Sequence, residues 1–228
     1  MQKSQMSNEI APLILFDLDG TLLDSARDLH AAMNTLLADK SEPAIAFDEF
    51  RPVVSKGARA MLKQSFKSAD ENARELLLSE FLAVYEKGLA EFSLVFDGVN
   101  QVLKHIESAG SQWGIVTNKP FYLAVPLVEK LNWSTRSAIL LGGDSLPKKK
   151  PDPDQLIYAC EKMGIATELC VYVGDDERDV IAANRAGMRS IGALWGYRPV
   201  DDLPEYWGAH NLAEQPIDLL ENGLLNSL

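Results

Sequence analysis

The chain has 228 residues, of which 46% are hydrophobic and 24% are charged, the balance of a folded globular protein with one large domain or two small ones. Its formal net charge of −11 argues against nucleic acid as a partner, because nucleic acids are bound by basic faces. No apolar run reaches 18 residues, which argues against a membrane-spanning helix, so we expect a cytoplasmic protein.

The first predicted element is a strand at 13–16, whose four residues are all apolar. Such a run is typical of a strand buried on both faces of a parallel sheet. It is followed by Asp17, Asp19 and Gly20, and open α/β sheets place their active sites at the carboxyl ends of their strands. The alternative is an Asp-Gly turn with a solvated acid beside it. The later strand ends described below favour the functional interpretation.

Residues 25–92 have a helical pattern with no convincing strand. Because this section interrupts the alternation of strands and helices that follows it, we interpret it as a separate helical cap domain. The core would then consist of 1–24 and 93–228. The helices predicted within the cap cover 25–40, 47–50, a segment after Gly57, and 71–90.

From residue 99 onward, predicted helices and strands alternate, which requires a parallel sheet flanked by helices. The sequence therefore predicts an α/β fold with a doubly wound, Rossmann-like parallel sheet. The predicted strands cover 113–117, 138–141, 169–174 and 190–194, and the predicted helices cover 99–109, 120–131, 152–163 and 179–186.

Two further segments carry polar residues suited to a phosphate group. Thr117 and Asn118 lie between a strand and a helix, where a hydroxyl, an amide and backbone N–H groups can hold phosphate oxygens. The alternative is a helix N-cap, for which Thr and Asn are both favoured. Lys150 precedes Pro151, which restricts its backbone, and its ammonium could neutralise a phosphoryl group or an ionised nucleophile. A solvated lysine is the alternative there, and it is our interpretation of the two lysines before it.

The strand at 169–174 leads into a cluster of acidic residues. Asp175 follows it directly, and Asp179 lies one helical turn further on the same face. Carboxylates clustered in this way suit Mg²⁺, which takes one or two of them together with waters and a substrate phosphate. An acidic helix start, favoured by the helix dipole, is the alternative, but it does not account for the whole set of strand-end residues.

In their order and spacing these residues resemble the haloacid dehalogenase superfamily of phosphatases, and the resemblance spans nearly the whole chain. It implies the fold of that superfamily. The helical section is similar to the cap of the phosphoglycolate phosphatase branch. The motifs that carry the resemblance are Asp-Leu-Asp-Gly-Thr at 17–21, the strand-end Thr117, the Lys-Pro pair at 150–151 and Gly-Asp-Asp-Glu-Arg-Asp at 174–179.

The resemblance implies a Mg²⁺-dependent phosphatase that forms an aspartyl-phosphate. Asp17 would attack phosphorus, and Asp19 would act first as general acid and then as general base. Mg²⁺ would be bound by Asp17, the backbone carbonyl of Asp19, and Asp175, and would offset repulsion between nucleophile and phosphate. Asp179 would pair with Lys150 or with a metal-bound water. The implied ligands of the phosphoryl group are Thr117, Asn118 and Lys150.

The leading candidate substrates are 2-phosphoglycolate and N-acetylmuramic acid 6-phosphate, both of which carry a carboxylate. In the cap, we expect Arg59, and less strongly Lys56, to face the site and bind that carboxylate or a hydroxyl. The alternative is that Arg59 is a surface residue of a helix. Three short segments are similar to bacterial N-acetylmuramic acid 6-phosphate phosphatases, and they cover 116–120, 195–197 and 207–209.

Two other functions stay open at this point. A sugar phosphomutase of the same superfamily would share the covalent intermediate, and a non-catalytic binding protein could use the same fold. The expected partner is a small phosphorylated metabolite, without nucleic acid or membrane, bound by a monomer or homodimer. Cys160 and Cys170 have no metal-ligand spacing, and we expect both to be buried free thiols.

Overall fold

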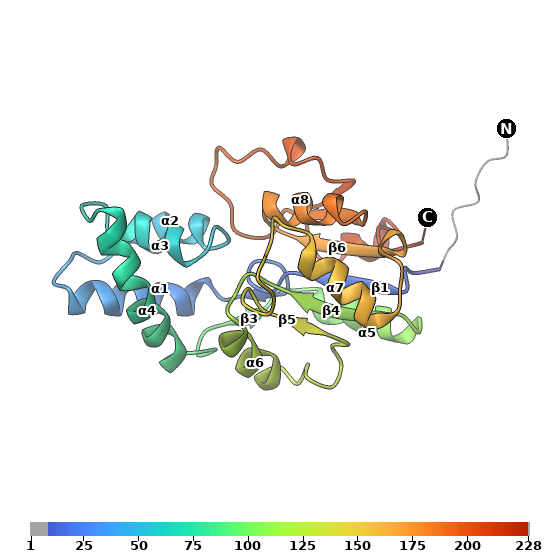
Figure 1. The fold of residues 1–228 in the computed structure, drawn as a ribbon, viewed down its shortest axis with the longest axis horizontal. Coiled ribbons are helices and arrows are strands. Elements are labelled where there is room, and N and C mark those ends of the chain that lie inside the picture. The colour runs from blue at the N-terminus through green and yellow to red at the C-terminus, as the bar shows by residue number, and fades with distance from the viewer. Residues whose placement is uncertain (1–8, 228) are drawn as a thin grey trace.

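A six-stranded parallel sheet is the centre of the molecule, which is described here by a computed structural model of residues 9–227 (Figure 1). Its strands are β1 Leu13–Phe16, β4 Gln112–Val116, β5 Leu140–Leu141, β6 Cys170–Gly174, β7 Arg189–Ala193 and β8 Asn211–Ala213. They lie in the order β5-β4-β1-β6-β7-β8, and all neighbours are parallel. The strand β1 therefore lies between β4 and β6.

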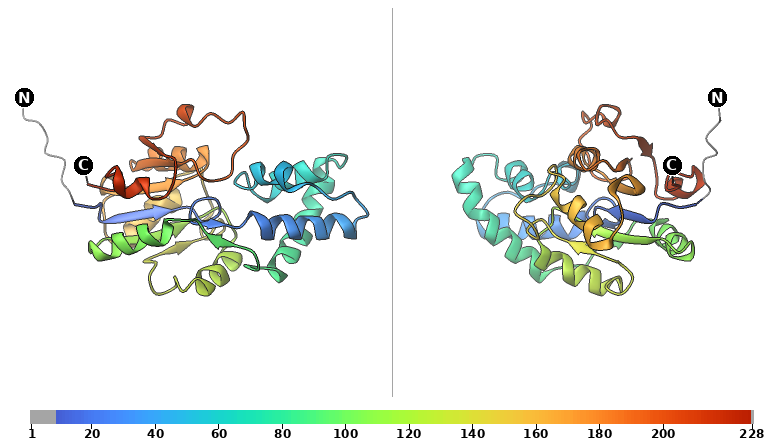
Figure 2. Two further views of the ribbon diagram at one scale, coloured as in Figure 1. Left: turned by 180° about the vertical axis from the view of Figure 1, so that it is seen from behind. Right: turned by 45° about the vertical axis from the view of Figure 1, so that its right-hand side comes forward.

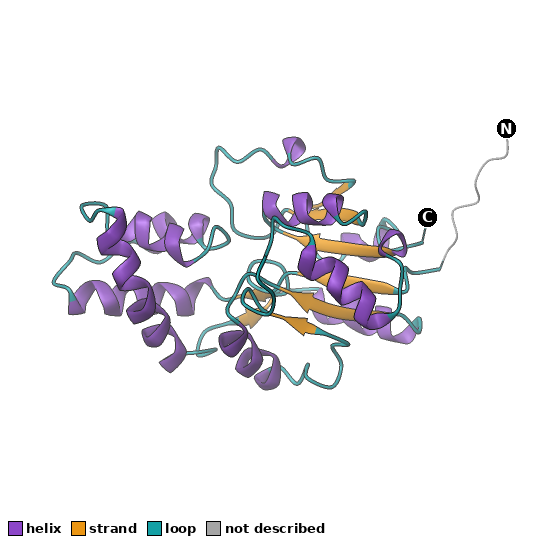
Figure 3. Cartoon of the chain, viewed as in Figure 1, coloured by secondary structure: helices purple, strands orange, loops and turns teal. Residues whose placement is uncertain are grey.

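Strand β1 is buried on both faces, as its apolar run predicts. Ile14 and Phe16 belong to one hydrophobic cluster, and Leu13 and Leu15 belong to another on the opposite face. Figure 3 shows helices on both sides of the strands. The first cluster includes residues of α5 Val99–Ser108, α6 Phe121–Lys130 and α9 Asp218–Glu221, and the second includes residues of α7 Asp154–Met163 and α8 Glu177–Arg185.

Four helices form a second hydrophobic core beside the sheet, and Figure 2 shows them together on one side of it. Met33 and Leu37 of the first helix and Phe81 of the fourth are fully buried in this core. Leu123 and Tyr197 from the sheet domain also belong to it, so the two parts of the molecule share packing. The helices are α1 Ala26–Asp39, α2 Phe47–Phe50, α3 Ala58–Ser65 and α4 Glu71–Lys87.

The chain passes between the two parts at two adjacent segments. The short strands β2 Leu23–Asp24 and β3 Leu94–Val95 pair antiparallel, which brings the outgoing and returning connections side by side. Asp28 accepts hydrogen bonds from the backbone N–H groups of Phe92 (2.7 Å) and Ser93 (3.0 Å), which fixes the return. The boundaries at 24/25 and 92/93 stay a prediction.

The predicted α/β fold with a parallel sheet and a helical cap inserted after the first strand is confirmed. Cys160 and Cys170 are buried free thiols, as expected. Between residues 9 and 227, no helix has both the length and the apolar character needed to cross a bilayer. Elements that the sequence did not predict are β2, β3, β8, α9 and the 3-10 turns η1 Arg51–Val53, η2 Thr167–Leu169 and η3 Pro204–Tyr206.

Candidate active site

Three neighbouring strands end at the same edge of the sheet, and candidate site residues follow each of them directly. Strand β1 pairs in register with both β4 and β6, so their carboxyl ends lie at nearly the same level. Asp17 therefore lies between Thr117 and Asp175. In the chain, Thr117 follows Asp17 by about a hundred positions, and Asp175 follows Thr117 by about sixty. The sheet topology thus assembles the predicted site.

Lys150 lies between two carboxylates at this edge. Its Nζ is 3.0 Å from Asp17 Oδ1 and 2.7 Å from Asp179 Oδ1, and it donates a hydrogen bond to the Tyr172 hydroxyl at 2.7 Å. Only 1% of its side chain is exposed. Burial opposes the charge on Lys150, but Asp17 and Asp179 outweigh burial, so the pKa of Lys150 is raised above its ordinary value. The site therefore contains a fixed ammonium.

The carboxylate of Asp175 is held by three donors from distant parts of the chain. Its Oδ1 accepts a hydrogen bond from Thr21 Oγ1 at 3.2 Å. Its Oδ2 accepts hydrogen bonds from the backbone N–H of Tyr197 at 2.9 Å and from the hydroxyl of Ser55 in the cap. Asp175 is thus oriented by both the sheet domain and the cap.

Asp179 lies in the first turn of α8, the helix that follows β6, and its Oδ2 accepts a hydrogen bond from the backbone N–H of Asp176 at 3.1 Å. Burial, partly offset by the charge of Lys150, raises the pKa of Asp179 to about 7. Burial and then the charges of Asp17 and Asp179 raise the pKa of Asp175 well above its ordinary value. Asp17, Asp175 and Asp179 together therefore bring more negative charge to the site than Lys150 alone can balance.

The donor set fits a divalent cation. One carboxylate oxygen from each of Asp17, Asp175 and Asp179 lies within 4.8 Å of the others. Asp17 Oδ1 is buried and accepts no well-aligned hydrogen bond from any residue of 9–227. Clustered carboxylate oxygens with an unused lone pair are the ligands that Mg²⁺ prefers. Two of the predicted metal ligands, Asp17 and Asp175, belong to this cluster. Asp179, for which pairing with Lys150 or with a metal-bound water was predicted, belongs to it as well.

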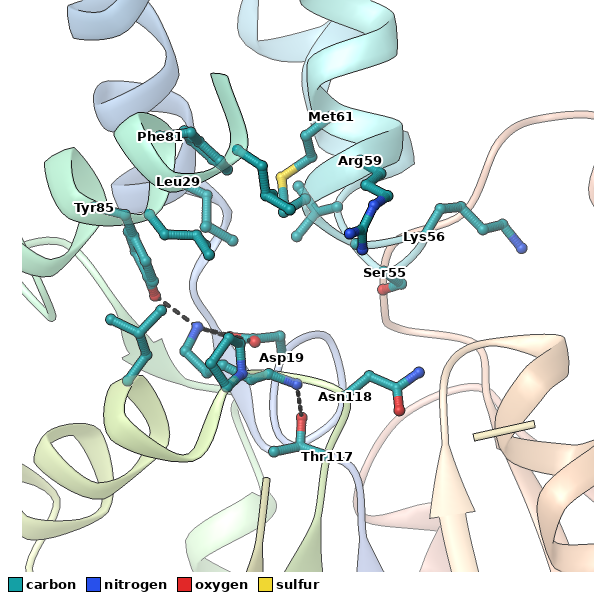
Figure 4. A pocket seen from close by; sticks show the side chains of 18 of the residues that line it. Asp19, Leu29, Ser55, Lys56, Arg59, Met61, Phe81, Tyr85, Thr117 and Asn118 are labelled. Carbon is teal, nitrogen blue, oxygen red and sulfur yellow. Dashed lines mark hydrogen bonds and ion pairs between the residues drawn. The ribbon is translucent and has the colours of Figure 1, made fainter. Parts of the chain in front are cut away.

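Asp19 lies beside this cluster and is held by a different cation. Lys119 Nζ is 3.0 Å and 3.2 Å from the two oxygens of Asp19, and the Ser25 hydroxyl also donates to Asp19 Oδ1. The ammonium donates in turn to the Tyr85 hydroxyl of the cap at 2.8 Å, a contact drawn in Figure 4. Burial opposes the charge on Lys119, but Asp19 outweighs it, so the pKa of Lys119 is raised. Burial also raises the pKa of Tyr85 to about 12.

Thr117 and Asn118 lie on the sheet side of the site (Figure 4). The Thr117 hydroxyl accepts a hydrogen bond from the backbone N–H of Lys119 at 3.2 Å. Asn118 Nδ2 donates to the carbonyl of Lys150 at 3.0 Å, which ties the loop after β4 to the loop that carries Lys150. The predicted phosphate ligands are therefore brought to one place.

A cavity of about 340 Å³ separates these polar groups from the cap. Its floor contains Asp17, Asp19, Thr117, Asn118 and Lys119, all from the sheet domain. The opposite wall comes from the cap and is mainly apolar, as Figure 4 shows for Leu29, Met61 and Phe81. A volume of this size is typical of a small-molecule site with few, well-placed polar groups.

The family of haloacid dehalogenase-like hydrolases matches residues 14–193 of the chain. The chain belongs to that family. The matched range contains every strand-end residue described above, so the predicted membership is confirmed.

Proteins similar in sequence or in structure cover most of this chain. A protein of Xanthomonas campestris named phosphoglycolate phosphatase is 52% identical over 91% of this chain and 94% of its own length. One of Pseudomonas aeruginosa named N-acetylmuramic acid 6-phosphate phosphatase is 38% identical over 91% of this chain and 92% of its own. A crystal structure of a predicted phosphoglycolate phosphatase from Haemophilus somnus matches with a TM-score of 0.84 at 26% identity, covering 96% of this chain and 99% of that one. These relatives confirm the prediction of a phosphatase of this superfamily.

Both predicted cap residues already have acidic partners in the hydrolase. Arg59 is paired with Glu75 through contacts of 2.8 Å and 2.6 Å, and two-thirds of its side chain is exposed. Lys56 is paired with Asp176 at 3.0 Å and Asp202 at 3.1 Å, and Figure 4 shows its side chain directed away from Asp19. Both residues line the cavity, and their contact with substrate stays a prediction.

Among the residues at the site that were not predicted are Lys119, Tyr85 and Arg178. Lys119 stands next to Asn118, and its position within that motif was the available signal. Tyr85 is 34 residues from its partner Lys119, and nothing in its local sequence indicates the contact. Arg178 donates to Asp176 Oδ1 at 2.7 Å and to backbone carbonyls of the cap, a role that only the packed domains reveal.

Proposed function

We propose that this hydrolase cleaves phosphomonoesters of small metabolites and that Asp17 is the nucleophile. The observation that carries the proposal is the state of Asp17 Oδ1. That oxygen is buried at the floor of the cavity, lies 3.0 Å from the Lys150 ammonium, and accepts no well-aligned hydrogen bond within 9–227. A carboxylate oxygen held in this way is free to attack an electrophile that enters the cavity.

The reaction then proceeds in two displacements. An oxygen of Asp17 attacks phosphorus, the ester P–O bond breaks, and a proton on Asp19 passes to the leaving oxygen. In the second displacement Asp19 takes a proton from water, and the water oxygen attacks the same phosphorus. The bond between phosphorus and Asp17 breaks, and inorganic phosphate leaves. The contact of Asp19 with Lys119 and Ser25 would hold it at one orientation for both proton transfers.

The remaining polar groups would bind the phosphoryl oxygens. Thr117 and Asn118 offer a hydroxyl and an amide, and Lys150 offers a buried positive charge beside Asp17. Asp17, Asp175 and the backbone carbonyl of Asp19 would hold Mg²⁺, with Asp179 close enough to take part. When bound, the ion supplies positive charge that offsets the repulsion between a carboxylate and a phosphate dianion.

The substrate would be a small phosphorylated metabolite, with 2-phosphoglycolate and N-acetylmuramic acid 6-phosphate as the leading candidates. The names of the relatives from Xanthomonas campestris and Pseudomonas aeruginosa support these two compounds. The cavity, enclosed between the cap and the strand ends, has room for a group beyond the phosphate. Exclusion of water by the cap would favour transfer to Asp17 over side reactions.

Phosphate release with MgCl₂ tests the proposal on both candidates and on glucose 6-phosphate. The Asp17→Asn variant should lose activity by about a thousandfold or more on every substrate, because it lacks the nucleophile. The matched control is Asp48→Asn on the exposed face of α2, which should retain it. Full activity of Asp17→Asn would contradict the assigned nucleophile. Release that requires a sugar bisphosphate activator would indicate a mutase.

A further inference from the structure

We infer that Lys119 binds a carboxylate of the substrate, so that the enzyme selects phosphomonoesters that carry one. This inference rests on the proposed phosphatase function and names its substrate class. It assigns to a buried residue of the sheet domain the role that the sequence suggested for Arg59 in the cap.

The position of the Lys119 ammonium is the first observation. Its side chain is 4% exposed, and it forms part of the cavity floor next to Asp19. Its partners are one carboxylate, that of Asp19, and one hydroxyl, that of Tyr85, whose ring lies 4.4 Å from Nζ. An ammonium has three N–H donors, and three acceptor atoms lie within hydrogen-bond distance of this one, namely both oxygens of Asp19 and the Tyr85 hydroxyl. A substrate carboxylate in the cavity would therefore take the place of one of these acceptors.

Most of the other cations around the cavity have acidic partners, and Lys149, which also lines the cavity, is exposed. Lys150 is held by Asp17 and Asp179 at the phosphate end. Lys56 and Arg178 are paired with Asp176, and Arg59 is paired with Glu75 at the exposed rim. Among the described residues that line the cavity, Lys119 is therefore the buried cation placed to meet the part of a substrate beyond its phosphate.

The surroundings of Lys119 make it selective for charge. The cavity wall above it is formed by apolar side chains of the cap, including Leu78, Phe81 and Leu82. Charges interact more strongly in such surroundings than in water, and an unpaired charge there is costly. A substrate carboxylate would therefore be attracted to Lys119, whereas a neutral group would leave the ammonium with the partners it already has, Asp19 and Tyr85. Because Lys119 contacts Asp19, the bound carboxylate would also orient the leaving group toward its proton donor.

Matched substrate pairs test this inference. One pair is 2-phosphoglycolate and its amide, and the other is N-acetylmuramic acid 6-phosphate and N-acetylglucosamine 6-phosphate, which lacks the carboxylate. The decisive pair is the one whose carboxylated member is hydrolysed faster by the wild type. In that pair, the wild-type kcat/KM for the carboxylated compound should exceed that for the neutral compound by about tenfold or more. Lys119→Met should reduce that ratio at least tenfold, and Lys119→Arg should restore part of it. Arg59→Met should leave the ratio unchanged.

The exposed Lys148→Met is the matched control for removal of a lysine, and it should leave the activity itself unchanged. Equal losses of Lys119→Met on both members of a pair would show that Lys119 only positions Asp19, which overturns the inference. A wild-type enzyme that hydrolyses the neutral compounds as well as the carboxylated ones also overturns it, whether or not the variants fold. A protein that releases phosphate from none of the compounds would instead contradict the proposed function.

Discussion

Two glycines make room for the Asp175 carboxylate. A Cβ atom added at Gly20 would lie 2.1 Å from Asp175 Oδ2, and one added at Gly196 would lie 2.2 Å from it. Such distances are far inside van der Waals contact, so any larger residue must displace the carboxylate. Gly20 also has a φ of +86°, which other residues rarely adopt. At Gly196 the lack of space for a Cβ atom is the reason that glycine is required. The segment at 195–197 thus shapes the metal cluster without supplying a charged group.

We expect Gly196→Ala to displace Asp175 and to weaken Mg²⁺ activation by about tenfold or more, because groups that orient a metal ligand control its affinity. Overpacking should also lower the free energy of unfolding by about 1–3 kcal/mol. The half-activating Mg²⁺ concentration and a denaturant titration measure these effects. The matched control is Gly88→Ala, where the nearest neighbour of the added Cβ is the Glu91 side chain, 4.0 Å away. Wild-type Mg²⁺ activation in Gly196→Ala would show that Asp175 tolerates the added methyl group.

Individual residues at the site differ in how far the sequence reveals them. Asp17, Asp19 and Asp175 each follow an apolar run, so strand assignment alone places them at one edge of the sheet. Lys119 and Tyr85 meet across the domain boundary, and neither carries a local pattern that predicts the contact. Pairings of this kind depend on how the cap is seated, which periodicity does not report.

The cap segment 54–57 is bound to the start of α8, the helix that follows β6. Ser55 donates to Asp175, and Arg178 donates to the carbonyls of Ser55 and Lys56. Lys56 adds ion pairs to Asp176 and Asp202. These contacts hold the cap against the residues that form the carboxylate cluster. A movement of the cap would therefore also change the positions of the carboxylates in the cluster.

Loss of the Lys56 ammonium should loosen this attachment. Each of its ion pairs is partly exposed and worth about 1 kcal/mol or less, so we expect Lys56→Met to lower kcat/KM about three- to tenfold, mainly through KM. The loss should be the same for carboxylated and neutral members of a substrate pair, since Lys56 acts on the cap. Lys63→Met, an exposed change on α3, is the control. A loss confined to carboxylated substrates would instead support the direct contact that the sequence suggested for Lys56.

Five of the six strands of the sheet were predictable, because each is a largely apolar run and these runs alternate with helices of the expected period, whereas β8 was not predicted. The cap was predictable as an interruption of that alternation. The pair β2 and β3 was not predicted, because two residues per strand carry no periodicity and the pairing joins segments about seventy residues apart. This pairing brings together the two ends of the cap insertion. The connection between the domains therefore depends on tertiary contacts, which local sequence does not report.

The carboxylate cluster should also make the stability of the whole protein depend on pH and Mg²⁺ together. The folded-state pKa of Asp179 is about 7, against an ordinary value of 3.8, and that of Asp175 is also raised. At pH values between the unfolded-state and folded-state pKa, the folded state holds more protons than the unfolded state. The free energy of unfolding of the metal-free protein therefore falls as pH rises through this interval. For Asp179 the loss amounts to about 2–4 kcal/mol from pH 4 to pH 8.

Mg²⁺ binds the deprotonated carboxylates of the folded state, so its stabilising effect should grow over the same pH interval. We expect the melting temperature with Mg²⁺ to exceed that with EDTA by about 5–10 °C at pH 8 and by much less at pH 5. Comparing the two conditions at each pH cancels the other titrating groups, such as Asp176, whose pKa is lowered because Arg178 and Lys56 outweigh its burial. In Asp175→Asn the difference at pH 8 should shrink, while Asp48→Asn should retain it. An equal Mg²⁺ effect at both pH values would mean that the ion binds away from this cluster.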